Sequence, residues 1–504
     1  MARAQRRVNR VQPAASSVPF PAPVGGLNKR DNRSSLDPTE ARELLGWLPD
    51  QGTLRVRDGY TQFATSVGSG VVPTLVRYRG AAAQKLIAIA GGTIYDVSSS
   101  TPSTISAAGY TSNYWQLENF NGYLIGVNGE DTPFRYDGST ASATGFTGSG
   151  LTLTNLVNVA LVRNRLWFCE NASADVWYGG LGAITGTLTK FQLSQIAQGG
   201  KCMAIMPWSR DSGAGADDVT VFLMDTGEVI VYEGDPASTF SKIGSYRAGV
   251  PVGRQCWVKY GGDLVLITRI GFLPMHTVLS GLPEDVNQID IWGKVAPGVV
   301  DDVRLYGANA GWSARFVDKL IIFNVPIGSG AAVQYVLNTT NNRWTQFDYP
   351  AAAFEEYNGE IYFGSMAGGT TQQIGGATDN GIAITATARG GFGYPLSQSA
   401  NKHITAIRPN ITADGIVDGY LEVDVDFEST DFGTTSVEIV SAGSITPWGS
   451  PWGSPWGTKP KAPKIWFAKH ARGRAIAIAL RVSTKAANVQ WDSSDMLQKP
   501  VGVL

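Results

Sequence analysis

Paired apolar runs joined by two- or three-residue turns recur through the middle of the chain and constrain its fold most. The turns carry Gly, Asn or Asp, the residues that tight β-hairpins need. Their recurrence at intervals of about 30–60 residues is typical of propeller blades. The pairs are Lys85–Val97, Trp115–Val127, Val157–Phe168, Asp218–Tyr232, Cys256–Thr268, Ala314–Phe323 and Ala353–Phe363.

These hairpins predict an all-β fold in which residues 73–376 form a β-propeller. We expect six to eight blades, seven being favoured, and a pair of β-sandwiches is the alternative. Composition agrees, because only 16% of the residues are charged while Gly numbers 60, as in turn-rich β structure.

The pattern changes in residues 377–504, which we expect to form a separate C-terminal β-sandwich-like domain. Apolar Leu421, Val423 and Val425 alternate with acidic residues, which predicts a half-exposed antiparallel strand with Asp424 and Asp426 in solvent. Further strands are predicted at Ile382–Arg389, Ile404–Ile411, Ser436–Val440, Lys464–Ala468 and Ala475–Val482.

A Pro-Trp-Gly-Ser repeat within this domain carries Trp448, Trp452 and Trp456. Proline removes backbone donors and glycine weakens a strand, so the repeat predicts a turn-rich loop. The three indoles either lie flat on their own domain or form an aromatic surface against a neighbouring subunit.

Residues 21–72 are predicted to form an N-terminal strap of a helical turn followed by a strand. Asp37-Pro38-Thr39-Glu40 has the residue types of a helix start, and Pro49 ends the helical segment. We expect the strap to pack on the edge of a β domain.

Residues 1–20 are expected to be a disordered basic arm, with Arg3, Arg6, Arg7 and Arg10 at its start. Such an arm is either a solvated tail or a docking segment for a partner or nucleic acid. No apolar stretch follows it as in a signal peptide, and no run is long enough to span a bilayer.

The sequence offers no constellation of catalytic, cofactor-binding or metal-ligating residues, so we predict a protein that is not an enzyme and uses no cofactor. His276, His403 and His470 lie far apart in the sequence, and no established metal or nucleophile motif is present. Cys169, Cys202 and Cys256 suit buried positions and synthesis in a reducing cytosol. The net charge of −1 argues against a dedicated nucleic-acid binder.

One ordered string of residues resembles a known family. Gly25-Gly26-Leu27-Asn28, Asp37-Pro38, Ala41, Trp47-Leu48-Pro49 and Arg55–Tyr60 resemble the N-terminal signature of tail tube nozzle proteins of short-tailed bacteriophages, the podophage tail hub/nozzle family. The Trp-Gly repeats that precede Arg472-Gly473-Arg474 are similar to the C-terminal region of that family. Between these two regions the resemblance is architectural only.

This resemblance implies a structural virion protein, made in the host cytoplasm and located in the virion tail. It implies a homohexamer, a ring below the portal and its tail adaptor protein. The ring would conduct genomic DNA through its lumen without sequence-specific binding and support tail fibres and a tail plug or needle. The candidate interface residues are Leu27, Trp47, Tyr60, Trp448, Trp452 and Trp456.

Two alternatives stay open. One is a carbohydrate-binding or hydrolytic β-propeller, since tryptophans stack on sugars; it needs carboxylates that converge at one propeller mouth. The other is a cytosolic scaffold propeller of WD or kelch type, although the repeat signatures of those families are missing.

Overall fold

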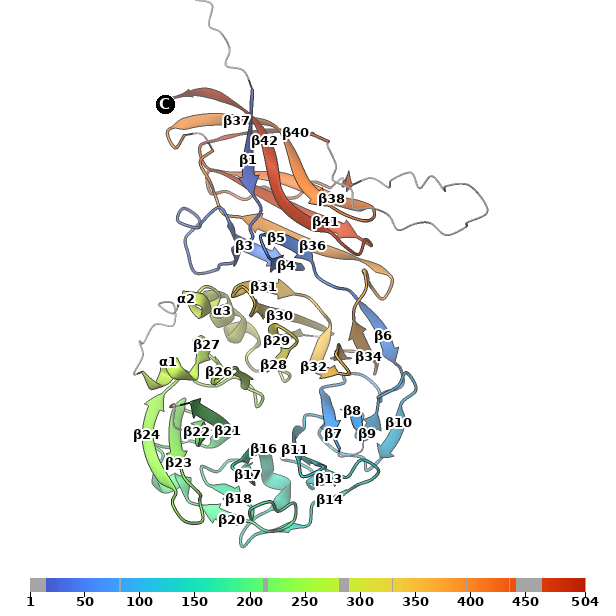
Figure 1. Ribbon diagram of the computed structural model, residues 1–504, viewed down its shortest axis with the longest axis vertical. Helices are drawn as coiled ribbons and strands as arrows, with labels where there is room; N and C mark the ends of the chain where they lie inside the picture. The colour runs from blue at the N-terminus through green and yellow to red at the C-terminus, as the bar shows by residue number, and fades with distance from the viewer. Residues whose placement is uncertain are drawn as a thin grey trace, which may run out of the picture. The chain divides into compact units, whose positions relative to one another are not determined.

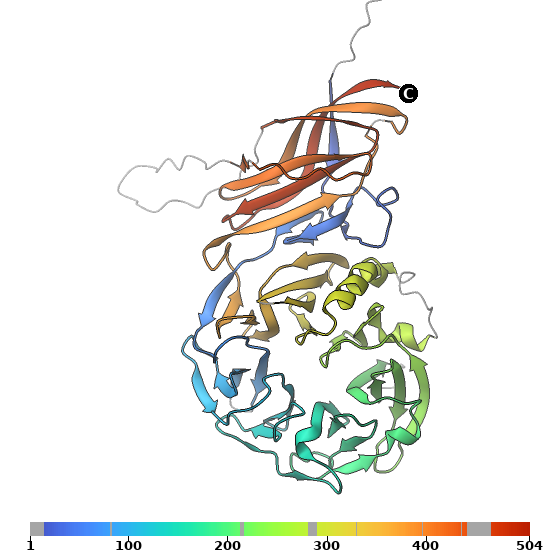
Figure 2. The same cartoon turned by 180° about the vertical axis from the view of Figure 1, so that it is seen from behind.

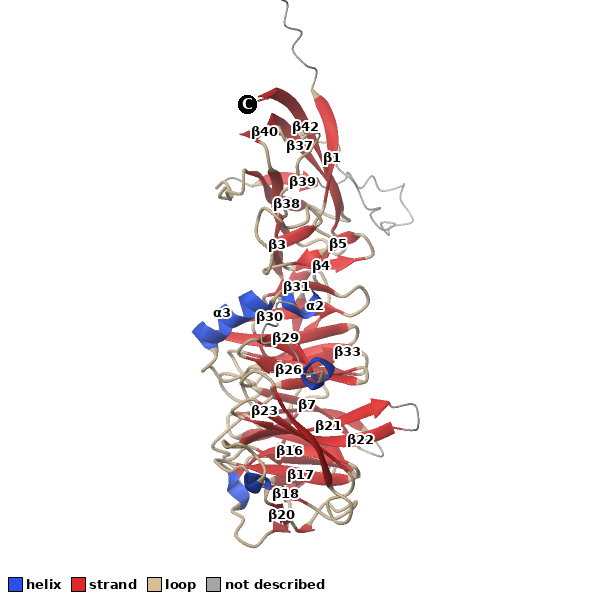
Figure 3. Ribbon diagram, turned by 90° about the vertical axis from the view of Figure 1, so that its left-hand side faces the viewer, coloured by secondary structure: helices blue, strands red, loops and turns tan. Residues whose placement is uncertain are grey.

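The computed structural model describes residues 15–80, 83–211, 216–280, 290–328, 330–395, 397–434, 436–440 and 465–503. Contacts divide the chain into two compact units. The propeller unit is Asp58–Asn380, and the terminal unit combines Met1–Arg57 with Gly381–Leu504. Strands dominate both units (Figure 3), which confirms the expected all-β class.

The strands of the propeller unit form, within its described residues, seven antiparallel blade sheets that follow one another around a common centre (Figures 1 and 2), besides the small β15-β19 pair. The first four are β7 (Thr74–Arg79), β8 (Gln84–Ala90), β9 (Thr93–Asp96) and β10 (Ser103–Ser106); β11 (Gln116–Phe120), β12 (Tyr123–Val127), β13 (Phe134–Tyr136) and β14 (Ala141–Ala143); β16 (Leu156–Val162), β17 (Arg165–Glu170), β18 (Val176–Tyr178) and β20 (Thr189–Phe191); and β21 (Cys202–Asp211), β22 (Ala216–Met224), β23 (Glu228–Glu233) and β24 (Ser241–Arg247). The other three are β25 (Trp257–Tyr260), β26 (Asp263–Thr268) and β27 (Gly271–Pro274); β28 (Ser313–Val317), β29 (Leu320–Gly328), β30 (Ala331–Asn338) and β31 (Arg343–Phe347); and β32 (Ala351–Tyr357), β33 (Glu360–Ser365) and β34 (Thr371–Ile374) with β6 (Tyr60–Ala64).

Each of the predicted hairpins lies in a different one of these sheets, so the propeller expectation is confirmed. Local turn chemistry explains why: Asn121 and Gly122 both have positive φ, 47° and 79°, as do Asn358 and Gly359, 53° and 81°. This is the backbone of a type I′ turn, which asparagine and glycine adopt at little cost. The twist of such a turn matches the twist of the two strands that it joins.

Short elements and helices complete the propeller unit. β15 (Phe146–Thr147) pairs in parallel with β19 (Gly186–Thr187), and two 3-10 turns cover Leu153–Asn155 and Leu193–Gln195. The helices α1 (Met275–Leu279), α2 (Asp290–Gly293) and α3 (Ala296–Tyr306) follow the three-stranded sheet. None of the helices in the described ranges has the length and hydropathy needed to span a lipid bilayer.

A strand from the N-terminal side completes the last blade. β6 pairs antiparallel with β34, with Tyr60 opposite Ile374 and Ala64 opposite Thr371. The short β35 (Thr378–Asp379) pairs with β6 in parallel, and Asn380 Oδ1 accepts a hydrogen bond of 2.7 Å from the Gln62 amide. The ring is therefore closed by hydrogen bonds between its two ends.

The terminal unit combines strands from both ends of the chain into two sheets. One sheet has the order β4-β5-β42-β37-β40, with β1 paired to β42, and the other joins β2, β3, β36, β41, β38 and β39. The N-terminal strands are β1 (Ser16–Pro21), β2 (Gly26–Leu27), β3 (Glu40–Leu45), β4 (Trp47–Asp50) and β5 (Thr53–Val56). The C-terminal strands are β36 (Ile382–Gly390), β37 (Ala400–Thr412), β38 (Val417–Val425), β39 (Val437–Val440), β40 (Phe467–Gly473), β41 (Ile476–Thr484) and β42 (Gln490–Val503).

The predicted helical turn in the strap is wrong, because residues Glu40–Leu45 form a strand. Asp37 Oδ1 accepts hydrogen bonds from the amide and hydroxyl of Thr39, at 2.8 and 2.6 Å, and so makes a turn. β3 then pairs with β36 and β2, and these long-range bonds override the local helix preference. The predicted strap 21–72 is also no single domain, since the boundary between the units falls after Arg57.

Candidate functional site

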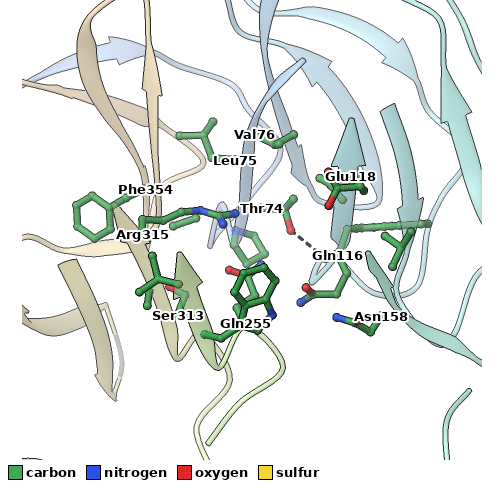
Figure 4. Close-up of a pocket in the computed structure, with 18 of the residues that line it drawn as sticks. Thr74, Leu75, Val76, Gln116, Glu118, Asn158, Gln255, Ser313, Arg315 and Phe354 are labelled. Atoms are coloured by element: carbon green, nitrogen blue, oxygen red, sulfur yellow. Dashed lines mark hydrogen bonds between the residues drawn. The ribbon is translucent and has the colours of Figure 1, made fainter. Parts of the chain in front are cut away.

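A cavity of about 310 Å³ lies where the first strands of the blades converge in the propeller unit (Figure 4). Its walls come from β7, β11, β16, β25, β28 and β32, together with residues just before these strands. Much of the lining is polar or charged, which is unusual for an interior and typical of a site that holds water or a polar ligand. The polar lining residues are Thr74, Gln116, Glu118, Asn158, Gln255, Lys259, Ser313 and Arg315.

Glu118 is the most perturbed carboxyl of this cavity. Desolvation raises its pKa to about 7, and Arg315 and Arg79 offset only part of that effect. Desolvation also raises the pKa of Glu355, one residue beyond the lining residue Phe354, and here the charge of Arg315 opposes the shift most. The two carboxyls thus share the field of one guanidinium, and both are half-buried, although only Glu118 lines the cavity.

A second cavity, of about 340 Å³, adjoins the first. Pro73, Gln116, Gln255 and Ser313 line both cavities, so the two adjoin, and we call them together the axial channel. Arg254 borders the second cavity and donates a hydrogen bond of 2.6 Å to the Asn128 carbonyl oxygen.

The hydroxyl of Thr74 at the first cavity is already engaged by the fold. Thr74 Oγ1 donates to the Asn113 carbonyl oxygen at 2.6 Å and accepts from the Trp115 amide at 3.0 Å. A hydroxyl held in this way has no base to activate it as a nucleophile. Thr74 is therefore no candidate nucleophile in this cavity.

A buried charge cluster in the terminal unit corrects the expectation that Asp424 is solvated. Asp424 is fully buried, and its carboxylate bonds to Arg42 and to Arg389, the latter at 3.1 Å. The Thr430 amide donates to it at 2.7 Å. Sequence alternation could not reveal this, because both arginines come from distant strands. None of Arg42, Arg389 and Asp424 lines either of the two cavities described above.

The histidines are closer than their sequence separation suggested. The rings of His403 on β37 and His470 on β40 lie 5.8 Å apart. His276 instead contacts the Asp263 carboxylate. In the part of the chain that the structure describes, no three His, Cys, Asp or Glu side chains are placed to hold a metal ion.

The three cysteines are buried, as predicted. Cys169 and Cys202 come from adjacent blades, and their Sγ atoms lie 3.3 Å apart, a proximity that the sequence spacing did not indicate. Burial raises the pKa of Cys256 to about 12 and that of Cys169 above its ordinary value. These thiols are therefore poor nucleophiles at neutral pH.

The interface candidates divide into three groups. Leu27 and Trp47 are 1% and 0% exposed, and Trp47 packs on Trp491 with the ring centroids 6.0 Å apart, so both are core residues that present no surface to a neighbouring subunit. Tyr60 is half-buried in β6, edge-on to Phe363 at 5.2 Å. Trp448, Trp452 and Trp456 lie outside the described residues.

The arrangement of the blades around a common centre defines the class as a β-propeller protein. No protein-family model matches the chain, and no curated protein does. Solved structures with a similar fold include the WD40 β-propeller domain of Doa1, at 11% identity, TM-score 0.38 and coverage of 63% of this chain and 96% of that one. YCF48 bound to D1 peptide has 9% identity, TM-score 0.33 and coverages of 65% and 96%.

A longer similar structure is the extracellular domain of a one-component system from B. thetaiotaomicron. It has 9% identity and TM-score 0.43, and the match covers 80% of this chain and 58% of that chain. At these identities the likeness concerns the fold alone.

Proposed function

We propose that this chain is a structural virion protein, one subunit of a homohexameric tail nozzle of a short-tailed bacteriophage. In this proposal the ring lies below the tail adaptor, conducts the genome and supports fibres and a plug. The observation that carries it is the ordered N-terminal string from Gly25 to Tyr60, which resembles the nozzle signature.

Close contacts explain why particular residues stand at several positions of this string. This supports the view that the string is not an accident of the amino-acid composition. A Cβ on Gly25 would lie 2.8 Å from the Thr39 carbonyl oxygen, and one on Gly59 would lie 2.1 Å from that of Thr378. Asn28 Nδ2 donates to the Glu40 carboxylate at 2.7 Å. Each of these positions thus needs its own residue for this particular fold.

Oligomeric state tests the proposal directly. Light scattering after size-exclusion chromatography, with negative-stain imaging, is expected to show a six-fold ring, alone or with the tail adaptor. A protein that stays monomeric under both conditions contradicts the nozzle assignment.

The Trp-Gly repeat offers a second test, on infectious particles. Deletion of residues 446–458 is expected to impair tail completion while the far-UV spectrum and thermal unfolding stay unchanged. The matched control replaces the repeat with a Gly-Ser segment of equal length. A further series of variants carries this segment with one of the three tryptophans restored. Normal titres of infectious particles that carry the deletion would show that the repeat is not part of the proposed interface.

The axial channel favours a second candidate function, the binding of a small polar ligand such as a sugar. The charge of Arg315 acts on Glu118, which lines the channel, and on Glu355, one residue beyond the lining residue Phe354. The fold thus brings two carboxyls into the range of one guanidinium, which the sequence did not indicate. Glycan-array binding by a monomeric protein that is lost in Arg315→Ala would favour this function over the nozzle.

A further inference from the structure

Two buried cysteines from neighbouring blades face each other in the propeller unit. Cys169 lies on β17, and Cys202 is the first residue of β21, which begins the next blade. Their Sγ atoms lie 3.3 Å apart. A disulfide has an S–S length of about 2.0 Å, so the two sulfur atoms need to approach by only about 1.3 Å to be bonded. The pair is therefore a candidate for a covalent link between two blades.

The surroundings of the two thiols are apolar. Cys169 and Cys202 are 0% and 1% exposed, and they belong to a core cluster that includes Trp167, Ile205 and Phe222. Burial raises the pKa of Cys169, so the reactive thiolate is rare at neutral pH and the pair reacts slowly. A disulfide carries no charge and fits an apolar core without the cost of burying a thiolate.

One side chain separates Cys169 from the axial channel. Asn158, labelled in Figure 4, lines the first cavity, and its Oδ1 atom lies 3.9 Å from Cys169 Sγ. The same oxygen accepts a hydrogen bond of 3.2 Å from the Ile205 amide, which holds the asparagine in place. A molecule as small as hydrogen peroxide that enters the channel is thus one side chain away from the pair. The burial of both thiols keeps larger oxidants away.

We propose that Cys169 and Cys202 form an intramolecular disulfide when the folded protein meets hydrogen peroxide, and that this bond cross-links two neighbouring blades. The Cys169 sulfur attacks one peroxide oxygen, the O–O bond breaks, and the other oxygen leaves as water with the thiol proton. The Cys202 sulfur then attacks the resulting sulfenic acid at sulfur. The S–O bond breaks, the S–S bond forms, and a second water leaves with the Cys202 proton. Two thiols are oxidised and one peroxide is reduced.

The cross-link has a calculable effect on stability. Cys169 and Cys202 are 33 residues apart in the sequence, and the loop between them contains β18 and β20 of the same blade. A bond across this loop removes conformations from the unfolded chain, which corresponds to a rise of about 5 °C in the thermal midpoint of a unit of this size. The inference rests on the propeller unit alone and holds whether or not the nozzle function is correct.

Peptide mapping of the full chain tests the proposal. The protein is purified with reductant, transferred to buffer without it, treated with a small excess of hydrogen peroxide, and unfolded in N-ethylmaleimide to block the remaining thiols. The expected result is one cross-link between the tryptic peptides 166–190 and 202–210, while Cys256 in peptide 255–259 is alkylated. The cross-link should form faster at pH 9 than at pH 7, because the thiolate is the attacking species.

Two variants complete the test. Cys202→Ala is expected to form no cross-link and to show no rise of the thermal midpoint after peroxide treatment. The matched control Cys256→Ala removes the third buried cysteine and should keep both the cross-link and the rise.

Several outcomes would overturn the proposal. They are three alkylated thiols after treatment of the wild-type protein, a cross-link that includes Cys256, and a sulfinic acid on Cys169 without a cross-link. A dimer on non-reducing electrophoresis would also overturn it, because the bond would then join two chains. A complete cross-link between Cys169 and Cys202 that leaves the thermal midpoint unchanged would contradict the stabilising link between the blades.

Discussion

At the scale of single residues, the charged side chains of the interior govern how stability depends on pH. Burial beside the axial channel raises the pKa of Glu118 above the value of 4.5 that it has in an unfolded chain, to about 7. Between these two values the unfolded state loses its proton before the folded state does. The contribution of Glu118 to stability is therefore highest below pH 4.5 and falls as the pH rises through 7.

Glu118→Gln is expected to raise the free energy of unfolding at pH 8 by at most about 3 kcal/mol, the amount that corresponds to the pKa shift. The variant should gain less at pH 4, because wild-type Glu118 is already protonated there. Urea unfolding at both pH values measures the difference. Exposed Glu360→Gln serves as the control, and an equal gain from it would contradict the role of burial.

Asp424 tests the opposite case, a buried carboxylate that is fully paired. Asp424→Asn leaves the guanidinium of Arg42 without its paired carboxylate and leaves Arg389 with Glu43 as its remaining partner. The side chains of Arg42 and Arg389 are 13% and 12% exposed. We expect a loss of about 3–5 kcal/mol in the free energy of unfolding. The control Asp301→Asn breaks a pair exposed by 65% and 74%, and should cost under about 1 kcal/mol. Similar losses of unfolding free energy in both variants would show that burial does not make the Asp424 cluster more sensitive than an exposed ion pair.

At the scale of elements, the closing strand β6 depends on a close backbone approach at Gly59. A Cβ there would lie 2.1 Å from the Thr378 carbonyl oxygen and 2.5 Å from its carbon. Real side chains do not tolerate such contacts, so Gly59→Ala must push β35 away from the start of β6.

Gly59→Ala is expected to destabilise the protein by about 1–3 kcal/mol, as overpacking does. Faster hydrogen exchange should appear first at the β6 and β34 amides. Gly262→Ala is the matched control, since nothing lies within 4 Å of its Cβ position. Unchanged exchange at β6 in Gly59→Ala would refute this account of the closure.

At the scale of the whole molecule, the position of the unit boundary has a direct consequence. Residues 58–380 include β6 and β35, whereas the predicted propeller range 73–376 omits both. Without β6 the last blade ends at β34, which keeps β33 on one side and loses its antiparallel partner on the other. An unpaired strand edge invites aggregation.

We therefore expect a chain of residues 58–380 to be monodisperse and to unfold cooperatively. A chain of residues 73–376 should aggregate, or its unfolding midpoint should be lower by at least 5 °C, because a packed blade has lost one strand. Differential scanning calorimetry with light scattering compares the two. Equal midpoints would mean that β6 contributes nothing to the closure.

The sequence alone was sufficient for the propeller hairpins and for the separate character of the C-terminal strands. Pairs such as Asn121-Gly122 select their turn through the φ values of adjacent residues, and apolar alternation reports strand faces directly. These determinants act over a few residues, so they are visible without the fold.

Only the tertiary structure decided which distant segments pair. Residues Glu40–Leu45 form a strand because β36 and β2 pair with them, and a helix could not form these hydrogen bonds. The tertiary structure buried Asp424 beside arginines from other strands, and it aligned His403 with Arg472 and Lys499. Residues far apart in sequence meet only through strand register and packing, and no local preference encodes either.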